Sequence, residues 1–488
     1  MNDQEAFTDI EPTSDEDSLA ELGVAAAAAA IRDGGITSEA YTSAMLSRAR
    51  RLSGLNSFIT IDESAVLAAA VEADNARAAG IVAPLLGVPV GVKDSYQTRG
   101  LRTTLGVKTL AQFVPETDAD VVAAIKAAGG LVFGKNNLVE MSFGLTGHNQ
   151  HHGQVKNPHA PDHVSGGSSS GSAAAVAAGI VPAALGGDTV GSIRVPASLC
   201  GVVGFKPTTG RWPRDGVAPI SHTLDTTGVF ARTVEDCMVV DQVVTNEAGS
   251  QPHRSDLKGA RLAYAPRQYL DLVDAETMAQ FEDALLRLRD AGAEVEEVDL
   301  GDDFSEMAGR VTWDIFFRET KEGVSEFLRR NEFPASFEEI YRDLKPQLKD
   351  VWGHLVLPSG PGHLTEDAYR SAMSVDRPEI QRRLGDVFTL GGFDALVFPT
   401  TPSAAPSIDQ QWKFTISGVE VDDLVLAKNT VPTSGAGIPG VSIPTGLNRS
   451  GLPIGIEFDG AHGHDRKLLD LARQAESVFE PLPALLSH

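Results

Sequence analysis

Short apolar segments alternate with helical segments along most of the chain, and this alternation limits the fold more than any other feature of the sequence. Helices are expected at residues 22–32, 38–52, 64–79, 118–128, 172–178 and 275–288, and the stretch 303–390 is expected to be mainly helical. Extended segments are expected at residues 85–93, 131–134, 181–185, 262–265, 294–298, 395–398, 440–444 and 454–458. Because strands that alternate with helices form a sheet with both faces covered, the sequence predicts an α/β fold.

The chain has 488 residues and no linker rich enough in Pro, Gly or Ser to separate independent domains. Its length suits two or three average domains or one large α/β domain. Hydrophobic residues make up 42% of the chain, which is enough for a large core. Residues 1–21 contain eight acidic residues and no basic one, so we expect a mobile N-terminal segment there.

The net charge of −25 restricts the partners of this chain. It argues against nucleic acid, because phosphate binding needs basic patches, and against anionic membrane surfaces. The longest apolar stretch near the N-terminus, residues 24–31, is too short to span a bilayer, and the N-terminus lacks the pattern of a secretory signal. Cys200 and Cys237 are too few for a disulfide scaffold, which favours a reducing compartment. We therefore expect a cytoplasmic protein with a small-molecule substrate.

Two segments rich in glycine and serine carry the clearest chemical signal. Residues 165–172 read SGGSSSGS and lead directly into an apolar helix, so a flexible linker is not expected. Residues 186–192 read GGDTVGS, and a glycine-flanked turn of this kind can point several successive backbone N–H groups at one place. A serine at the end of such a turn can attack a carbonyl while the N–H groups hold the resulting oxyanion.

The run at residues 166–197, GGSSSGSAAAVAAGIVPAALGGDTVGSIRVPA, resembles the signature of the amidase signature family. Flanking stretches at residues 87–95, 131–144, 201–211 and 437–460 also resemble segments of that family. The resemblance implies a single large domain, residues 22–488, with a central mixed twisted β-sheet covered on both faces by α-helices. Its implied parts are a helical cap at 22–80, a catalytic core at 82–245, a variable α-rich part at 250–390, and closing strands and a helix at 391–475.

The resemblance also implies a catalytic triad of Lys93, Ser168 and Ser192. Ser192 matches the nucleophile, Ser168 matches the serine that bridges it to Lys93, and the bond from Gly167 to Ser168 is expected to be cis. The implied oxyanion hole consists of the backbone N–H groups of Thr189, Val190, Gly191 and Ser192. Asp188 and Arg194 match residues that support this loop.

Such a triad needs an uncharged lysine. A lysine with a pKa near ~10.4 is a poor base at pH 7, but burial away from carboxylates favours the neutral form. Neutral Lys93 would take a proton from Ser168, which would take one from Ser192 as it attacks the carbonyl. The proton would then return to the leaving amine, and water would hydrolyse the acyl-enzyme by the same route. No cofactor and no metal is required.

The substrate is less constrained than the chemistry. Residues 210–236 are most similar to hydrolases of arylacetamides, which implies a small aryl or arylacetamide-type amide; aryl acylamidase and carbamate-cleaving activities are the alternatives within the family. Gly187 stands where the family commonly has Thr, and Val190 where it commonly has Gly, so Val190 is expected to narrow or reshape the site. Candidate acyl-pocket residues are Met141, Phe143, Leu145 and Thr146, with core packing an equal expectation for the apolar three; residues 303–390 are expected to contribute as well.

Two other functional hypotheses stay open at this point. Residues 167–171 satisfy G-x-S-x-G, which would make Ser169 the nucleophile of an α/β-hydrolase, although the residues before it do not form a convincing strand. The chain could also be a non-catalytic scaffold, despite having all three triad residues. Histidines between residues 148 and 163 suggest a metal site, but Pro158 and Pro161 interrupt any helical ligand spacing, so we expect an ordinary loop. A homodimer is left open.

Overall fold

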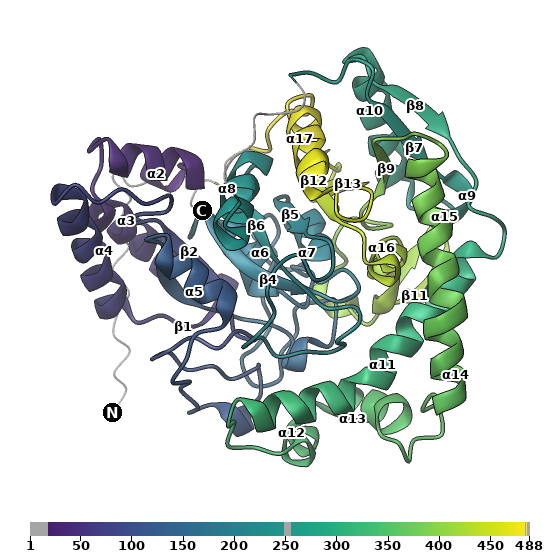
Figure 1. Ribbon diagram of the computed structural model, residues 1–488, viewed down its shortest axis with the longest axis horizontal. Coiled ribbons are helices and arrows are strands. Elements are labelled where there is room, and N and C mark those ends of the chain that lie inside the picture. Colours follow the sequence, from purple (N-terminus) through teal and green to yellow (C-terminus); the bar gives the residue numbers. More distant parts are fainter. Residues whose placement is uncertain (1–17, 248–254, 484, 486–488) are drawn as a thin grey trace.

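Figure 1 shows a computed structural model of the chain, which describes residues 18–247, 255–483 and 485. Most of the segment expected to be mobile, residues 1–21, lies outside the described residues, which begin at residue 18. Residues 18–20 are helical and Ala20 is buried. Helical structure is therefore present at residues 18–20, before the expected start of the domain at residue 22.

A mixed sheet of eleven strands runs through the described residues. Its spatial order is β1 (Phe58–Thr60), β3 (Leu131–Asn136), β2 (Pro89–Lys93), β4 (Ala183–Asp188), β6 (Thr226–Ala231), β5 (Val203–Lys206), β12 (Gly440–Leu447), β13 (Pro453–Asp459), β9 (Ala395–Pro399), β7 (Arg261–Tyr264) and β8 (Glu294–Glu297). Strand β2 is parallel to β3 and β4, and β7 is parallel to β8 and β9, whereas the other pairs are antiparallel. The prediction of a single α/β domain with a mixed sheet is confirmed.

The helices of the described residues are α2 (Val24–Arg32), α3 (Ser38–Arg51), α4 (Glu63–Ala78), α5 (Asp120–Ala127), α6 (Ser170–Ala177), α7 (Arg194–Cys200), α8 (Val234–Thr245), α9 (Pro266–Tyr269), α10 (Ala275–Asp290), α11 (Phe304–Arg330), α12 (Phe337–Asp343), α13 (Pro346–Val351), α14 (Glu366–Ser371), α15 (Arg377–Thr389), α16 (Val431–Ala436) and α17 (Asp465–Glu476). Those for which the sequence predicts both ends, α2 to α6 and α10, begin and end close to the predicted positions, whereas α7, α9 and α16 were not predicted. Thr37, for example, caps α3 by accepting a hydrogen bond from the backbone N–H of Ala40 at 3.0 Å.

The sheet separates two hydrophobic cores, as strand β9 illustrates. Ala395 and Val397 belong to one core, and Leu396 and Phe398 belong to the other. Side chains alternate between the two faces of a strand, so these cores lie on opposite faces of the sheet. In Figure 1, α2, α3 and α4 lie at one end of the molecule, and α14 and α15 lie at the opposite end. Helix α11 runs along the lower edge of the view toward α14 and α15. Helices thus flank the sheet on both faces.

Several elements differ from the sequence predictions. The segment expected to be extended from residue 85 becomes a strand only at Pro89, because the chain first turns at Gly87, whose φ is 77°. Strands β5 and β6 and helix α8 were not predicted. Every residue of β5 and β6 is buried, so neither strand shows the alternation of apolar and polar residues that marks a half-exposed strand. A small hairpin of β10 (Lys413–Ile416) and β11 (Val419–Asp422) was missed as well.

The sheet brings distant loops together at one edge. Strands β2 and β4 are parallel neighbours, with Val92 opposite Leu185, so their carboxyl ends meet at the same edge. Lys93 is the last residue of β2, and Asp188 is the last residue of β4. Helix α6 starts within the first glycine- and serine-rich segment, and α7 starts two residues after the second. The fold therefore gathers both segments around the end of β2.

A buried ion network holds the loop between β4 and α7. The Arg194 guanidinium donates to both carboxylate oxygens of Asp188 at 3.0 Å, to Glu457 on β13 at 2.6 Å and to Ser434 on α16 at 2.8 Å. Burial alone would raise the pKa of Asp188, but the charge and hydrogen bonds of Arg194 hold it below the usual value. Asp188 also accepts from the backbone N–H of Ile193 at 3.1 Å, which fixes the start of α7.

We predict that Arg194→Ala lowers the free energy of unfolding by about 3–5 kcal/mol, because it leaves two buried carboxylates without their cation. Arg194→Lys is the matched control, since it keeps the charge but loses the planar fork, and it should lose less stability. Urea denaturation of the three proteins measures the difference. A stability of Arg194→Ala equal to that of the wild type would show that the network does not hold the loop.

Candidate active site

Lys93 and Ser168 are in direct contact inside the protein. Lys93 is 1% exposed and Ser168 is fully buried, and Lys93 Nζ donates a hydrogen bond to Ser168 Oγ at 2.9 Å. Lys93 comes from the carboxyl end of β2, and Ser168 lies two residues before α6. The structure thus joins two residues that are 75 positions apart in the sequence.

Burial changes the ionisation of Lys93. The loss of solvent lowers the pKa of the ammonium group from 10.5 to about 7, although the charges of Asp188 and Asp225 oppose this shift. Within the described residues, no carboxylate forms a salt bridge with Lys93. A large fraction of this lysine is therefore neutral near pH 7 and able to accept a proton.

Ser168 is presented by a backbone that only glycines allow. The bond between Gly167 and Ser168 is cis, and Gly166 has a φ of 78°. A Cβ atom on Gly167 would lie 2.7 Å from the carbonyl oxygen of Gly144, and one on Gly166 would lie 2.7 Å from Cα of Pro196. The run of glycine before Ser168 is therefore required by close packing against the neighbouring loops.

Ser192 lies at the end of the second segment, in the loop from β4 to α7. The backbone N–H of Ser169 donates to the carbonyl oxygen of Ser192 at 3.3 Å, which holds the two serine segments against each other. In the described part of the chain, the Ser192 hydroxyl has no hydrogen-bond partner, including Ser168. Ser192 is 4% exposed. Its hydroxyl is thus not engaged in a structural contact.

The loop before Ser192 is anchored from a distant segment. Thr430 donates its hydroxyl to the carbonyl oxygen of Val190 at 2.6 Å. Gly191 has a φ of 141°, and a Cβ atom there would collide with the Thr430 side chain, so this position needs glycine. Turning the Val190 carbonyl toward Thr430 fixes the orientation of the peptide units that follow it.

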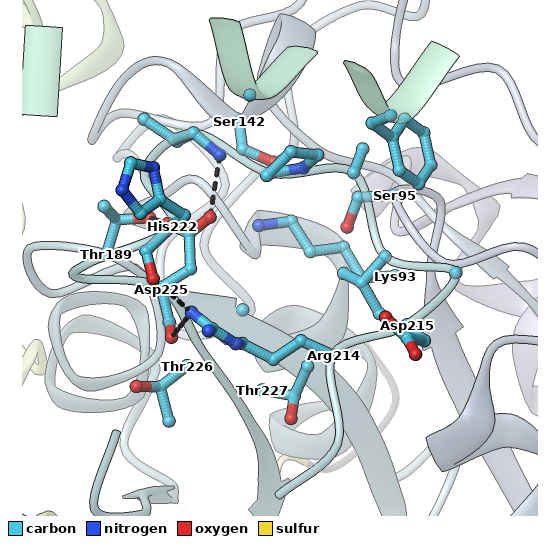
Figure 2. Close-up of a pocket in the computed structure, with 18 of the residues that line it drawn as sticks. Lys93, Ser95, Ser142, Thr189, Arg214, Asp215, His222, Asp225, Thr226 and Thr227 are labelled. Atoms are coloured by element: carbon cyan, nitrogen blue, oxygen red, sulfur yellow. Dashed lines mark hydrogen bonds between the residues drawn. The ribbon is translucent and has the colours of Figure 1, made fainter. Parts of the chain in front are cut away.

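A cavity of about 400 Å³ opens beside Lys93 and Ser168 (Figure 2). One wall contains Lys93, Ser168 and Thr189. Four consecutive lining residues form an apolar wall, namely Val217, Ala218, Pro219 and Ile220. Other lining residues come from the loop before β6 and from α11, namely Arg214, Asp215, Glu326, Phe327 and Arg330. Ser192 is not among the lining residues. The volume suits a small organic ligand.

The lining differs from the candidate pocket residues of the sequence analysis. Ser142 lines the cavity, but Met141, Phe143, Leu145 and Thr146 do not. Met141, Phe143 and Leu145 belong to the second hydrophobic core, where the Phe143 ring lies 4.9 Å from that of Phe316 and 5.0 Å from that of Trp352. Thr146 is 2% exposed. Met141, Phe143 and Leu145 therefore pack in the core, which was the equal expectation for these three residues.

The two departures from the family pattern have different surroundings. Val190 belongs to the second core and is not among the residues that line the cavity. Gly187 does line it, and a Cβ atom there would lie 4.0 Å from Lys93 Nζ and 3.9 Å from the carbonyl oxygen of Thr226. The missing side chain at Gly187 leaves open space beside the lysine amine.

Sequence reasoning missed the contribution of the loop before β6. Arg214, Asp225 and residues 217–220 line the cavity, and Asp225 lies beside Thr189 in Figure 2. The signal that could have found them is the pairing of β4 with β6, which places this loop next to Thr189. The stretch 303–390 was expected to contribute, and it lines the cavity through four residues of α11 and through Asn331, which directly follows the helix; the four are Gly323, Glu326, Phe327 and Arg330.

The hydroxyl of Ser169 is occupied by the backbone. Ser169 Oγ donates to the carbonyl oxygen of Gly187 at 3.1 Å and accepts from its N–H at 3.3 Å. No strand leads into Ser169, because residues 161–165 form a turn and isolated bridges. A nucleophile elbow of the α/β-hydrolase type requires such a strand and a free hydroxyl. This arrangement opposes the hypothesis that Ser169 is the nucleophile.

Two kinds of feature are absent from the described residues. No group of three or more His, Cys, Asp or Glu side chains in that part of the chain is arranged to hold a metal ion. Among the same residues, no helix is long and apolar enough to cross a membrane.

Comparison with known proteins identifies the family. Residues 40–469 match the family model described as Amidase. The chain is 36% identical to a mandelamide hydrolase of Pseudomonas putida, with 94% of this chain and 92% of the relative covered, and 34% identical to an indoleacetamide hydrolase of Pseudomonas savastanoi, with 94% and 97% covered. A crystal structure of an amidase matches with a TM-score of 0.83 at 30% identity, covering 94% of this chain and 100% of that one. The chain therefore belongs to the amidase signature family and is an amide-hydrolysing enzyme.

Proposed function

We propose that this enzyme hydrolyses a small arylacetamide-type amide through a Ser-cisSer-Lys triad of Lys93, Ser168 and Ser192. The observation that carries the proposal is the buried hydrogen bond from Lys93 to Ser168, formed by a lysine whose pKa is lowered to about 7. A buried amine in this state is a base that works near neutral pH. It needs neither histidine nor metal to activate a hydroxyl.

Proton transfer begins at Lys93. The neutral amine accepts the Ser168 proton while Ser168 accepts the Ser192 proton, and the Ser192 oxygen attacks the amide carbon. The tetrahedral intermediate then collapses, the carbon–nitrogen bond breaks, and the proton returns through Ser168 to the leaving nitrogen. Ammonia or an amine departs and leaves an ester on Ser192. Water attacks this ester by the same proton route, releasing the carboxylic acid and free Ser192.

The oxyanion that forms at each attack needs hydrogen-bond donors. The backbone N–H groups of Thr189, Val190, Gly191 and Ser192 are the proposed donors. Support comes from the contacts that fix this loop. These are the hydrogen bond from the Thr430 hydroxyl to the Val190 carbonyl oxygen and the ion pair of Asp188 with Arg194. A loop held in this way requires little rearrangement when the negative charge develops, which is the condition for strong stabilisation.

The cavity supports an aryl group next to the reacting amide. The apolar wall of the cavity consists of Val217, Ala218, Pro219 and Ile220. Together with Phe327, it offers an apolar surface of the kind that buries a single aromatic ring. The similarity to mandelamide and indoleacetamide hydrolases points to the same class of substrate. We therefore place the aryl ring of the substrate against this wall and its amide beside Ser168.

The nucleophile is tested by two neighbouring serines. Ser192→Ala should abolish hydrolysis of phenylacetamide-type amides and labelling by a fluorophosphonate probe, because both need the Ser192 oxygen. Ser169→Ala is the matched control: it removes a hydroxyl from the same site, but should keep both activities within about tenfold. A panel of arylacetamides, anilides and carbamates gives the substrate class. Activity that persists in Ser192→Ala would remove this residue as the nucleophile.

The base is tested by the pH dependence of the reaction. Only neutral Lys93 accepts a proton, so kcat/KM should fall as the pH drops below about 7, the lowered pKa of this lysine. Lys93→Ala should lower kcat by about 10²–10⁴-fold, the usual contribution of a general base. Initial rates between pH 5 and pH 9 measure both effects. A rate that stays constant from pH 9 down to pH 5 would contradict a lysine base.

A further inference from the structure

Thr189 and Asp225 form a hydrogen-bonded pair at the cavity, each one residue beyond the strand that it adjoins. Strands β4 and β6 are antiparallel, with Asp188 opposite Thr226 at their ends. The same register continued by one residue places Thr189 opposite Asp225. The Thr189 hydroxyl donates to Asp225 Oδ1 at 2.7 Å, and both residues line the cavity (Figure 2).

The second oxygen of Asp225 binds the backbone at the end of the apolar wall. Oδ2 accepts from the backbone N–H of Ile220 at 2.8 Å and from that of Ser221 at 3.0 Å. Ile220 is part of the apolar wall proposed to bind the aryl group. One carboxylate thus connects the proposed oxyanion loop, through Thr189, with the proposed ring-binding wall.

The loop that carries Asp225 is itself fixed. Arg214 donates to the backbone carbonyl oxygens of His222 at 2.9 Å and of Asp225 at 3.0 Å. Glu319 on α11 accepts from the hydroxyl groups of Ser221 and Thr223. The position of the Asp225 carboxylate is therefore determined by two separate anchors, and Thr189 takes its position from that carboxylate.

We propose that Asp225 is a positioning residue, whose carboxylate holds the Thr189 hydroxyl so that the oxyanion loop keeps a fixed distance from the ring-binding wall. The inference rests on the proposed function and adds to it a residue outside the triad. Small displacements of a catalytic loop strongly reduce the reaction rate, since an error of about 1 Å in position can lower the rate about 10²-fold. A carboxylate with three donors has little freedom to move.

The charge of Asp225 also acts on the Lys93 amine. Asp225 is half-buried, and the loss of solvent raises its pKa to about 6, against the hydrogen bond from Thr189 and those from the backbone of Ile220 and Ser221. Its charge raises the pKa of Lys93, as does that of Asp188, while Arg214 is the cation that faces Asp225 itself. Removing the charge of Asp225 therefore favours neutral Lys93 at lower pH.

The test compares four single variants, and the double variant of Asp225→Asn with Thr189→Val, with the wild-type enzyme. Asp225→Asn removes the charge and leaves one acceptor oxygen for three donors. Thr189→Val removes the hydroxyl, and Thr189→Ser keeps it. Thr208→Val is the matched control, because Thr208 donates its hydroxyl to buried Asp465 at 2.6 Å and does not line the cavity. Each is assayed for kcat and KM on an arylacetamide between pH 5 and pH 9, for fluorophosphonate labelling, and for thermal unfolding.

We expect Asp225→Asn and Thr189→Val each to lower kcat by about 10–100-fold, and the double variant to lose little more than either one, because both remove one interaction. Thr189→Ser should stay within about threefold of the wild type. Only Asp225→Asn should move the acid limb of the pH profile toward lower pH. Thr208→Val should lose thermal stability without changing kcat or the pH profile.

The outcomes separate the two proposals. A wild type that hydrolyses no amide and takes no label would overturn the proposed function and this inference with it. A wild type that is active, with Asp225→Asn unchanged in kcat and in its acid limb, would overturn the inference alone. The same holds if the losses of Asp225→Asn and Thr189→Val multiply in the double variant, or if Thr208→Val reproduces them.

Discussion

The burial of one lysine amine against one serine hydroxyl is the constraint on which the rest of the site depends. Lys93 ends a strand whose residues are all buried, so its amine has almost no access to water and loses most of its preference for the charged form. The contact with Ser168 then places one hydroxyl next to the neutral amine, as the group from which it would accept a proton. The other features of the site keep this arrangement in place or supply what a base alone cannot.

Charge placement around the site follows from that constraint. Asp188 and Asp225 both lie near enough to favour protonated Lys93, yet neither forms an ion pair with it in the described residues. Asp188 is bound on both oxygens by Arg194, and Asp225 by Thr189 and two backbone N–H groups. Each carboxylate is thus used to hold a loop, and its oxygens have donors other than the Lys93 amine.

How much of this could be predicted from the sequence depends on whether a feature is local. Helix caps such as Thr37 and the strand that ends at Lys93 follow from neighbouring residues, and the link between Lys93 and Ser168 was reached through the family resemblance. The role of Asp225 requires the register of β4 against β6, which no local pattern fixes, because both strands are buried. Met141 and Phe143 were candidates for the pocket and equally for the core, because the sequence does not show which way a loop residue faces.

The central claim, an uncharged Lys93 near neutral pH, is tested most directly by nuclear magnetic resonance of the lysine side chains. Protein labelled with ¹³C at lysine Cε would be titrated from pH 5 to pH 11, and the Lys93 signal assigned by its absence in Lys93→Ala. The account predicts a midpoint near pH 7 for this signal. A Lys93 signal that titrates at about 10.4, as an ordinary exposed lysine does, would contradict it.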